Sequence, residues 1–169
     1  MKTSIKPLLF ALLTVVAMSA VSCSEDEDNN PNNNTNANAT LLADQVRTTA
    51  QSGTWSITRF EEDGRDETSD YNGYSFTFNA DGNLTATNGQ NTVSGTWSVV
   101  VDSSSSNSSD DDDDDDSNDV DFNIFFVSPA DFEELSDDWD IISRTDTRIQ
   151  LIDISGGNGG TDYLTFQKN

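Results

Sequence analysis

The chain has 169 residues, of which 31 are acidic and 8 are basic, and it contains no histidine and one cysteine. The formal charge of −23 excludes electrostatic binding to nucleic acid, whose phosphates carry the same sign. Without histidine the chain can form neither a serine–histidine nor a cysteine–histidine catalytic pair, and it lacks the commonest zinc ligand. We therefore expect no catalytic residues, no cofactor and no metal, and one domain with tails.

Residues 1–22 have the features of a secretory signal. Lys2 and Lys6 form a basic start, and the apolar run over residues 8–16 is shorter than the roughly 20 residues that a membrane span needs. Small residues follow up to Cys23, the only cysteine. Removal of this segment leaves six basic residues against 31 acidic ones, a charge of −25.

The sequence Ala20-Val21-Ser22-Cys23 resembles the lipobox of bacterial lipoproteins. The resemblance implies that Cys23 is acylated, with palmitate among the acyl groups, and that it anchors the chain to a membrane. Stable anchoring takes more than one acyl chain. The acidic residues 24–28 are similar to the export signal of surface lipoproteins of Bacteroidetes-type bacteria, which implies the outer face of the outer membrane. A solvated acidic spacer is the alternative interpretation.

Residues 23–52 contain no aromatic side chain, and residues 29–38 are rich in asparagine. This composition predicts a disordered acidic and Asn-rich tether. Within it, residues 40–50 have the pattern of a short helix. Thr40 would be its N-cap, and Leu41, Leu42 and Val46 would form its apolar stripe.

From Gly53 onward the apolar residues alternate with polar ones, which predicts strands. Eight strands are expected, over residues 53–61, 73–79, 83–88, 92–101, 119–127, 138–145, 147–154 and 162–168. One helical turn is expected between strands five and six, with Ser128 as its cap and Pro129 as its first residue. Short turns such as Asp81-Gly82 make sequential strands antiparallel neighbours. The prediction is an all-β, eight-stranded antiparallel up-and-down barrel over residues 53–169, whose interior is filled or holds one small ligand.

Three tryptophans occupy inward positions of the alternation, namely Trp55, Trp97 and Trp139. We expect them in the core, although one could line a cavity mouth or stack on a sugar. Gly53-Thr54-Trp55 recurs as Gly95-Thr96-Trp97. In both copies glycine would permit close approach and tryptophan would fill a barrel end.

The Gly53-x-Trp55 opening resembles the lipocalin signature. Residues 78–83, 93–97 and 163–168 are similar to the lipocalin-like domains of Bacteroidetes lipoproteins. The resemblance implies an open-mouthed barrel for small apolar ligands, with Trp55 at its closed end. The Ser- and Asp-rich insert at residues 102–119 departs from that pattern.

Several acidic groups could carry chemistry. Residues 110–116 are seven consecutive aspartates. We expect a solvated, disordered loop there, with a loose calcium site as the alternative. Asp137, Asp138 and Asp140 flank Trp139, and Glu133 and Glu134 lie just before them. Such carboxylates could mimic a glycosidase site, although their proximity is expected by chance in this acidic chain.

Two groups of basic residues are further candidates for a functional role. Arg59 and Arg65 flank the acidic residues 61–63, which predicts a surface ion cluster. Arg144 and Arg148 lie near a turn and are expected as rim charges, or else as contacts to an anionic head group.

The leading hypothesis is a non-enzymatic surface lipoprotein of the outer membrane, lipidated at Cys23. Its barrel would hold a small hydrophobic molecule or serve as a structural surface module. The alternative is a glycan-binding β-sandwich that assists polysaccharide capture. The two differ in the tryptophans, since a barrel buries Trp55 and Trp97 whereas a sugar binder exposes a row of aromatic rings.

Overall fold

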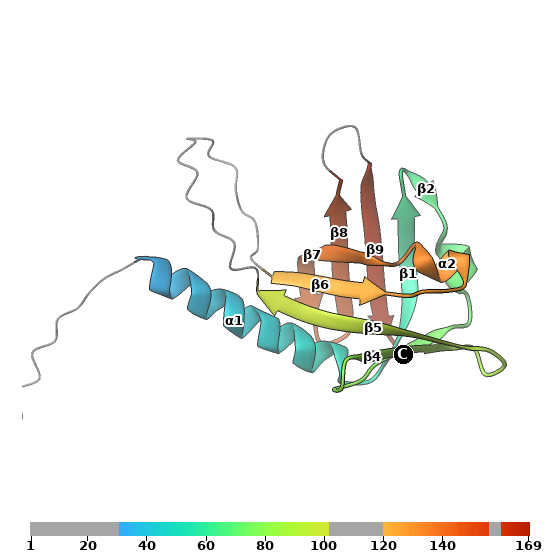
Figure 1. Cartoon of the computed structure of the whole chain (residues 1–169), viewed down its shortest axis with the longest axis horizontal. Coiled ribbons are helices and arrows are strands. Elements are labelled where there is room, and N and C mark those ends of the chain that lie inside the picture. The colour runs from blue at the N-terminus through green and yellow to red at the C-terminus, as the bar shows by residue number, and fades with distance from the viewer. Residues whose placement is uncertain (1–30, 102–119, 156–159) are drawn as a thin grey trace, which may run out of the picture.

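The structure is a computed structural model that describes residues 31–101, 120–155 and 160–169. Figure 1 shows the strands and helices, coloured along the chain from blue at the N-terminus to red at the C-terminus. The elements are α1 (Pro31–Ala50), β1 (Thr54–Glu62), β2 (Arg65–Asp66), the 3-10 turn η1 (Thr68–Tyr71), β3 (Ser75–Phe78), β4 (Asn83–Thr87), β5 (Thr92–Val101), β6 (Val120–Phe125), α2 (Ala130–Glu133), β7 (Asp137–Thr145), β8 (Arg148–Ile154) and β9 (Thr161–Lys168).

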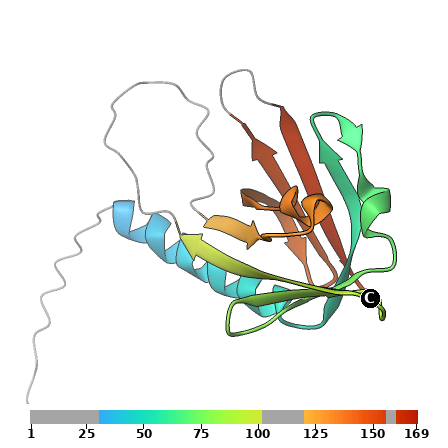
Figure 2. The ribbon, with the colours of Figure 1, turned by 45° about the vertical axis from the view of Figure 1, so that its right-hand side comes forward.

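Eight strands form a closed antiparallel barrel. The sheet order β1-β3-β4-β5-β6-β7-β8-β9 is a meander, and β9 pairs back onto β1. That closing ladder runs from Trp55 opposite Lys168 to Glu61 opposite Tyr163. Figure 2 shows the strands wrapping around a common interior. The predicted barrel is confirmed. The two-residue strand β2 was not predicted, and it pairs with β1 alone.

Burial alternates along the strands in the same way as the apolar and polar residues that predicted them. In β6 the residues are buried and half-buried in turn up to the exposed Phe125. The turn between β3 and β4 has Gly82 at φ +84°, the conformation that the Asp-Gly pair predicts. The Asp81 carboxylate accepts the backbone N–H of Asn83 at 3.1 Å, which fixes this turn and so the register of the hairpin.

Aromatic rings fill the middle of the barrel. Phe78 lies at the centre, with its ring centroid 5.2 Å from Trp97, 5.5 Å from Phe122 and 5.2 Å from Phe166, all in edge-to-face contact. Such pairs add to the free energy gained from burying the rings themselves. Among the described residues, the buried polar or charged ones are two threonines, Thr49 and Thr165.

All three tryptophans are buried, as predicted, and each indole N–H donates to a backbone carbonyl. Trp55 donates to Ala50 at 2.8 Å, Trp97 to Asn79 at 2.9 Å and Trp139 to Leu135 at 3.1 Å. The close approach expected at the second Gly-Thr-Trp copy is also confirmed. A Cβ on Gly95 would lie 2.4 Å from the carbonyl oxygen of Phe125 and 2.6 Å from the Phe126 ring.

Helix α1 corrects the prediction for the tether. It begins at Pro31 and not at Thr40, so most of the segment expected to be disordered is helical. The buried apolar side chains of α1, among those described, are Ala39, Ala43, Val46 and Ala50, spaced by about one helical turn. The predicted stripe was wrong at Leu41, which is 58% exposed. Because alanine side chains are small, they let the helix lie close to the barrel. The predicted apolar stripe did not include them.

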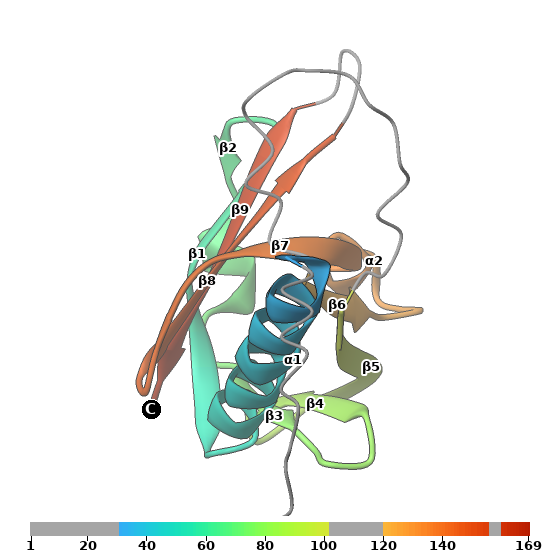
Figure 3. The same cartoon turned by 90° about the vertical axis from the view of Figure 1, so that its left-hand side faces the viewer.

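The helix covers the barrel on the side of β5 and β6. Figure 3 shows it in front of the barrel, between β1 and β5. Arg47 donates from Nε and Nη2 to the carbonyl oxygen of Val99 in β5, at 3.1 and 2.5 Å. Arg144 of β7 donates to Thr49 and Gln45 of α1, each at 2.9 Å.

Residues 23–30 of the expected tether lie outside the described residues. No helix in the described part of the chain is long and apolar enough to cross a membrane.

The predicted helical turn is present as α2, with one correction. Pro129 occupies the N-cap, one position before the first helical residue, and Ser128 is not the cap. Phe132 of α2 is buried and contacts the rings of Tyr71 and Phe126, with centroids 5.5 and 5.2 Å away. The short helix therefore covers an end of the aromatic core.

The docking of α1 is testable with a matched pair of substitutions. Ala43→Asp puts a charge where the side chain is fully buried, so we expect it to lower the free energy of unfolding by more than about 2 kcal/mol. Leu41→Asp, on the exposed face of the same helix, should change it by less than about 0.5 kcal/mol. Urea denaturation followed by tryptophan fluorescence measures both. Equal losses would contradict the docked position of α1.

Candidate functional site

Acidic side chains gather at one end of the barrel. Glu62 and Asp153 each lie two residues after a buried apolar residue of the same strand, and Asp162 lies two residues before one. Because side chains alternate along a strand, these carboxylates continue the inward-facing rows of the core. Asp137 does the same in β7, two residues before the buried Trp139. Together with two neighbouring glutamates, these residues form what we call the acidic rim: Glu62, Glu67, Glu134, Asp137, Asp153 and Asp162.

The sheet register forces the like charges of the rim together. Asp153 of β8 is the direct cross-strand partner of Asp162 in β9. Like charges in such a pair destabilise a sheet. The Asp162 carboxylate accepts the backbone N–H of Asp63 at 2.7 Å, which offsets part of that cost. The fold thus places two aspartates opposite each other although this pair is locally unfavourable. Such conflicts between local preference and fold are typical of functional positions.

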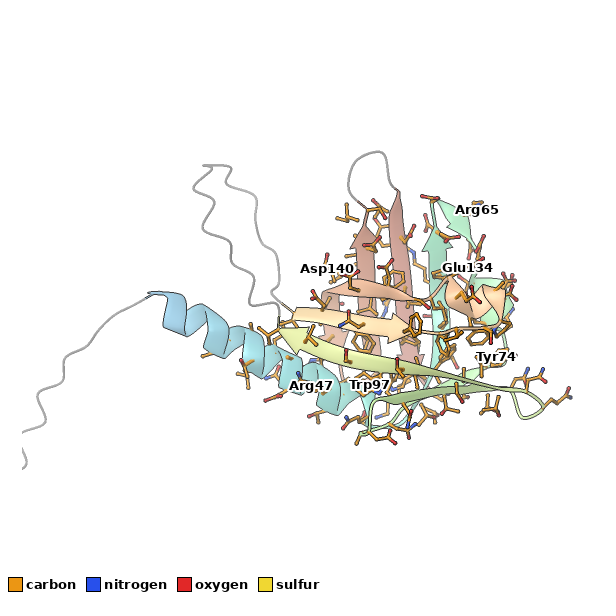
Figure 4. The ribbon with its side chains drawn as sticks, in the orientation of Figure 1. Arg47, Arg65, Tyr74, Trp97, Glu134 and Asp140 are labelled. Atoms are coloured by element: carbon orange, nitrogen blue, oxygen red, sulfur yellow. The ribbon has the colours of Figure 1, made fainter. Side chains whose placement is uncertain are left out.

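The tightest part of the rim is a group of three carboxylates, which we call the carboxylate triad. Glu62, Glu67 and Glu134 have carboxylate oxygens within 4.8 Å of one another. They come from the end of β1, the residue before η1 and the residue after α2. Arg65 is the nearby cation, with Nη2 3.7 Å from Glu62 and 3.6 Å from Glu67. Figure 4 shows Arg65 and Glu134 over the same part of the barrel.

The surroundings favour the protonated form of several rim carboxyls. Burial, and then the charge of Glu67, raises the pKa of Glu62. Burial and a hydrogen bond with Glu67 raise the pKa of Glu134. Burial and the neighbouring Asp138 raise the pKa of Asp137 to about 6. Burial and the charge of Asp153 raise the pKa of Asp140, which lies outside the rim on the same strand. Each shift has the sign expected for acids that lose water and face other acidic groups.

This arrangement can share protons and attract cations. Exposed acidic groups of this kind are common in proteins without a bound metal ion, and we assign no metal to the triad. The rim as a whole would attract a protonated amine and repel a carboxylate or phosphate, because the charges that line it have one sign.

The tryptophans do not form the exposed aromatic row that the glycan-binding alternative requires. The indole of Trp139 is 1% exposed and hydrogen-bonded to a backbone carbonyl, so it cannot stack on a sugar. Trp55 and Trp97 are buried as well, and the fold is one closed barrel. The alternative of a glycan-binding β-sandwich with exposed indoles is therefore wrong.

The basic candidates separate into different roles. Arg59 forms the expected surface ion pair with Glu61 at 2.8 Å and lies 3.9 Å from the centroid of the Tyr163 ring. Arg144 is not a free rim charge, because it bonds to α1, whereas Arg148 is exposed. Cys23 and residues 110–116 lie outside the described residues, so their expected roles stay predictions.

Sequence reasoning missed three members of the rim, namely Glu67, Asp153 and Asp162. A signal for the two aspartates was present, since Asp153 lies two positions after the last buried apolar residue of β8 and Asp162 lies two positions before the first one of β9. Glu67 could not be found in this way, because it lies in the connection between β2 and η1. Its position depends on how that connection folds back onto β1.

The raised pKa values predict that mild acid stabilises the protein. The native state holds protons on Asp137, Glu62 and Glu134 at pH values where the unfolded chain has released them, so this stability is lost as pH rises through the folded pKa values. We expect a higher Tm at pH 5 than at pH 7.5. Below about pH 4 the lowered pKa values of Asp66 and Asp81 reverse the trend.

Asp137→Asn should raise Tm at pH 7.5 and weaken the pH dependence, because Asn keeps the oxygen that accepts the N–H of Asp138 and cannot ionise. Asp146→Asn, in the exposed turn after β7, is the control and should leave the pH profile unchanged. A wild-type Tm that rises from pH 5 to pH 7.5 would contradict this account.

The chain was compared with family models, curated proteins and solved structures. No protein-family model matches the chain, and no curated protein does. Among solved structures, a DUF4847 family protein from Bacteroides vulgatus is similar, with 20% sequence identity and a TM-score of 0.44. The alignment covers 73% of this chain and 97% of that one.

Proposed function

We propose that this chain is a non-enzymatic binding protein, held at the cell surface by lipid on Cys23, whose barrel takes up a small hydrophobic molecule. The observation that carries the proposal is the composition of the barrel interior. Aromatic and aliphatic side chains make up the buried core, and the buried polar residues among those described are Thr49 and Thr165. Such an interior offers a favourable environment to an apolar molecule and little to a reacting group.

The interior also constrains how a ligand could be held. Phe76, Phe78 and Phe166 pack with ring centroids 5.2 to 5.5 Å apart, so a ligand must displace rings. The rings nearest an end of the barrel are those around Phe132, which belongs to the four-residue helix α2 and not to a strand. The proposed site therefore lies beneath α2.

The acidic rim adds a selection by charge. A ligand entering beside Glu62, Glu67 and Glu134 meets three carboxylates within 4.8 Å of one another. A fatty acid or a phosphorylated lipid would be repelled there. The proposed ligand is consequently an apolar molecule that is neutral or carries an amine.

The proposed anchor would keep the barrel near the membrane. Seven residues lie between Cys23 and the start of α1 at Pro31, so that the two Cα atoms can be at most about 28 Å apart along the chain. The expected charge of −25 on the processed chain opposes contact with an anionic bilayer. A short connection and a repelled domain together favour a barrel that stands just off the surface.

Binding can be tested with the uncharged fluorescent probe Nile red and the chain from residue 23 onward carrying Cys23→Ser. We expect saturable fluorescence enhancement, displaced by 1-decanol and much less by decanoate. The control is Phe125→Ser with Val127→Ser, which removes two exposed apolar side chains and should leave saturable binding intact. Enhancement that disappears in this control, or none at all, would point instead to a purely structural surface role.

The anchor has its own test in the native host. Metabolic labelling with an alkyne fatty acid should mark the wild-type chain and the Ser22→Ala chain, and should not mark Cys23→Ala. The labelled protein should fractionate with the outer membrane and be degraded by protease added to intact cells. Unlabelled wild-type protein would contradict lipidation, and labelled protein that resists protease would contradict surface exposure.

A further inference from the structure

Helix α2 closes the barrel with one aromatic side chain. Phe132 is 3% exposed, and its ring centroid lies 5.1 to 6.1 Å from those of Tyr71, Tyr74, Phe76 and Phe126. The helix has four residues, too few to be stable without tertiary contacts. Its position therefore depends on what holds the segment to the barrel.

The contacts that hold α2 are neutral. The Tyr71 hydroxyl donates to the carbonyl oxygen of Asp131. Trp139 donates to the carbonyl oxygen of Leu135 at 3.1 Å, and the Ser136 hydroxyl accepts the N–H of Phe126 at 2.9 Å. Burial raises the pKa of Tyr71, so its hydroxyl stays protonated. None of these contacts changes between pH 5 and pH 8.

The contact that opposes them is charged. Glu134 directly follows α2 and shares the carboxylate triad with Glu62 of β1 and Glu67 before η1. Asp63, and Asp162 of β9, add negative charge beside Glu62, and Asp131 adds it beside Glu134. Asp70 of η1 is a further acidic residue nearby, and Arg65 is the cation in contact with the triad. When the triad is ionised its members repel one another across the seam between α2 and β1. When it is partly protonated, one carboxyl can donate a hydrogen bond to another.

We propose that α2 is a proton-controlled lid on the barrel: protonation of the triad formed by Glu62, Glu67 and Glu134 fastens Phe132 over the aromatic core, and ionisation loosens it. The lid is tight in mild acid and opens more often at neutral pH. This inference rests on the proposed function for its purpose, since an opened lid exposes the rings that an apolar ligand must displace. It does not rest on that function for its mechanism, which concerns the protein alone.

Amide hydrogen exchange followed by mass spectrometry tests the lid on the chain from residue 23 carrying Cys23→Ser. After correction for intrinsic rates, exchange of residues 130–136 relative to β9 should increase by about two- to fivefold from pH 5 to pH 7.5, the range expected for repulsion between partly exposed charges. Sodium chloride at 1 M should shrink this increase, because the Debye length falls to about 3 Å.

Two adjacent substitutions separate the triad from general charge. Glu134→Gln removes a triad member and should abolish most of the pH dependence, with protection at pH 7.5 close to that of the wild type at pH 5. Glu133→Gln removes the same charge one residue earlier and should retain the wild-type profile. A wild-type profile that is flat with pH, or equal effects of the two substitutions, would overturn the proposal, and the salt series gives the same decision if Glu134→Gln does not fold.

The failure of the lid and the failure of the proposed function give different results. If the lid gates access, Nile red should associate faster at pH 7.5 than at pH 5, and Glu134→Gln should slow association at pH 7.5. No Nile red binding together with pH-dependent exchange of residues 130–136 keeps the lid and removes the binding function. Binding at a pH-independent rate together with pH-independent exchange removes the lid alone.

Discussion

The pairing of the first strand with the last is the constraint on which the remaining structure depends. Six residue pairs join β1 to β9, and they turn an open meander into a cylinder with one interior. Closure removes the two edges that an eight-stranded sheet would otherwise expose. It also fixes which side chains share that interior, because every strand alternates between inside and outside. The aromatic core, the burial of the three indoles and the convergence of acidic residues at one end all follow from this closure.

The strands and their order were predictable from the sequence because two-residue alternation and local turns are local signals. Tyr74, Phe76 and Phe78, followed by the Asp81-Gly82 turn, define a hairpin without reference to the rest of the chain. The N-terminal half of α1 was not predictable in the same way. Its contact surface is made of Ala39, Ala43 and Ala50 beside Val46, and alanine indicates a buried face only once the partner surface is known.

The acidic rim was partly predictable. Glu62 and Asp137 belong to acidic groups that stand out in the sequence, yet the pattern indicated a surface ion cluster and a chance resemblance to a glycosidase. The decisive information is the register between strands far apart in the sequence, which pairs Asp153 with Asp162. Glu134 joins Glu62 and Glu67 only because α2 packs across that end. Long-range geometry of this kind has no local signature, so composition alone presents these residues as ordinary solvated charge.

Under the anchoring at Cys23 that we propose, the attachment of α1 decides which cut in the chain would release a complete folded unit. The helix is held to the barrel by its own Arg47, which donates to Val99 of β5, and by Arg144 of β7, which donates to Thr49. Its last residue, Ala50, accepts a hydrogen bond from Trp55. A protease that cuts just before Pro31 would therefore release a complete folded unit, helix included, into the medium. A cut after Ala50 would instead leave the helix behind and uncover the surface that it protects. The position of the cut, before Pro31 or after Ala50, would then decide whether the released protein keeps α1 or lacks it.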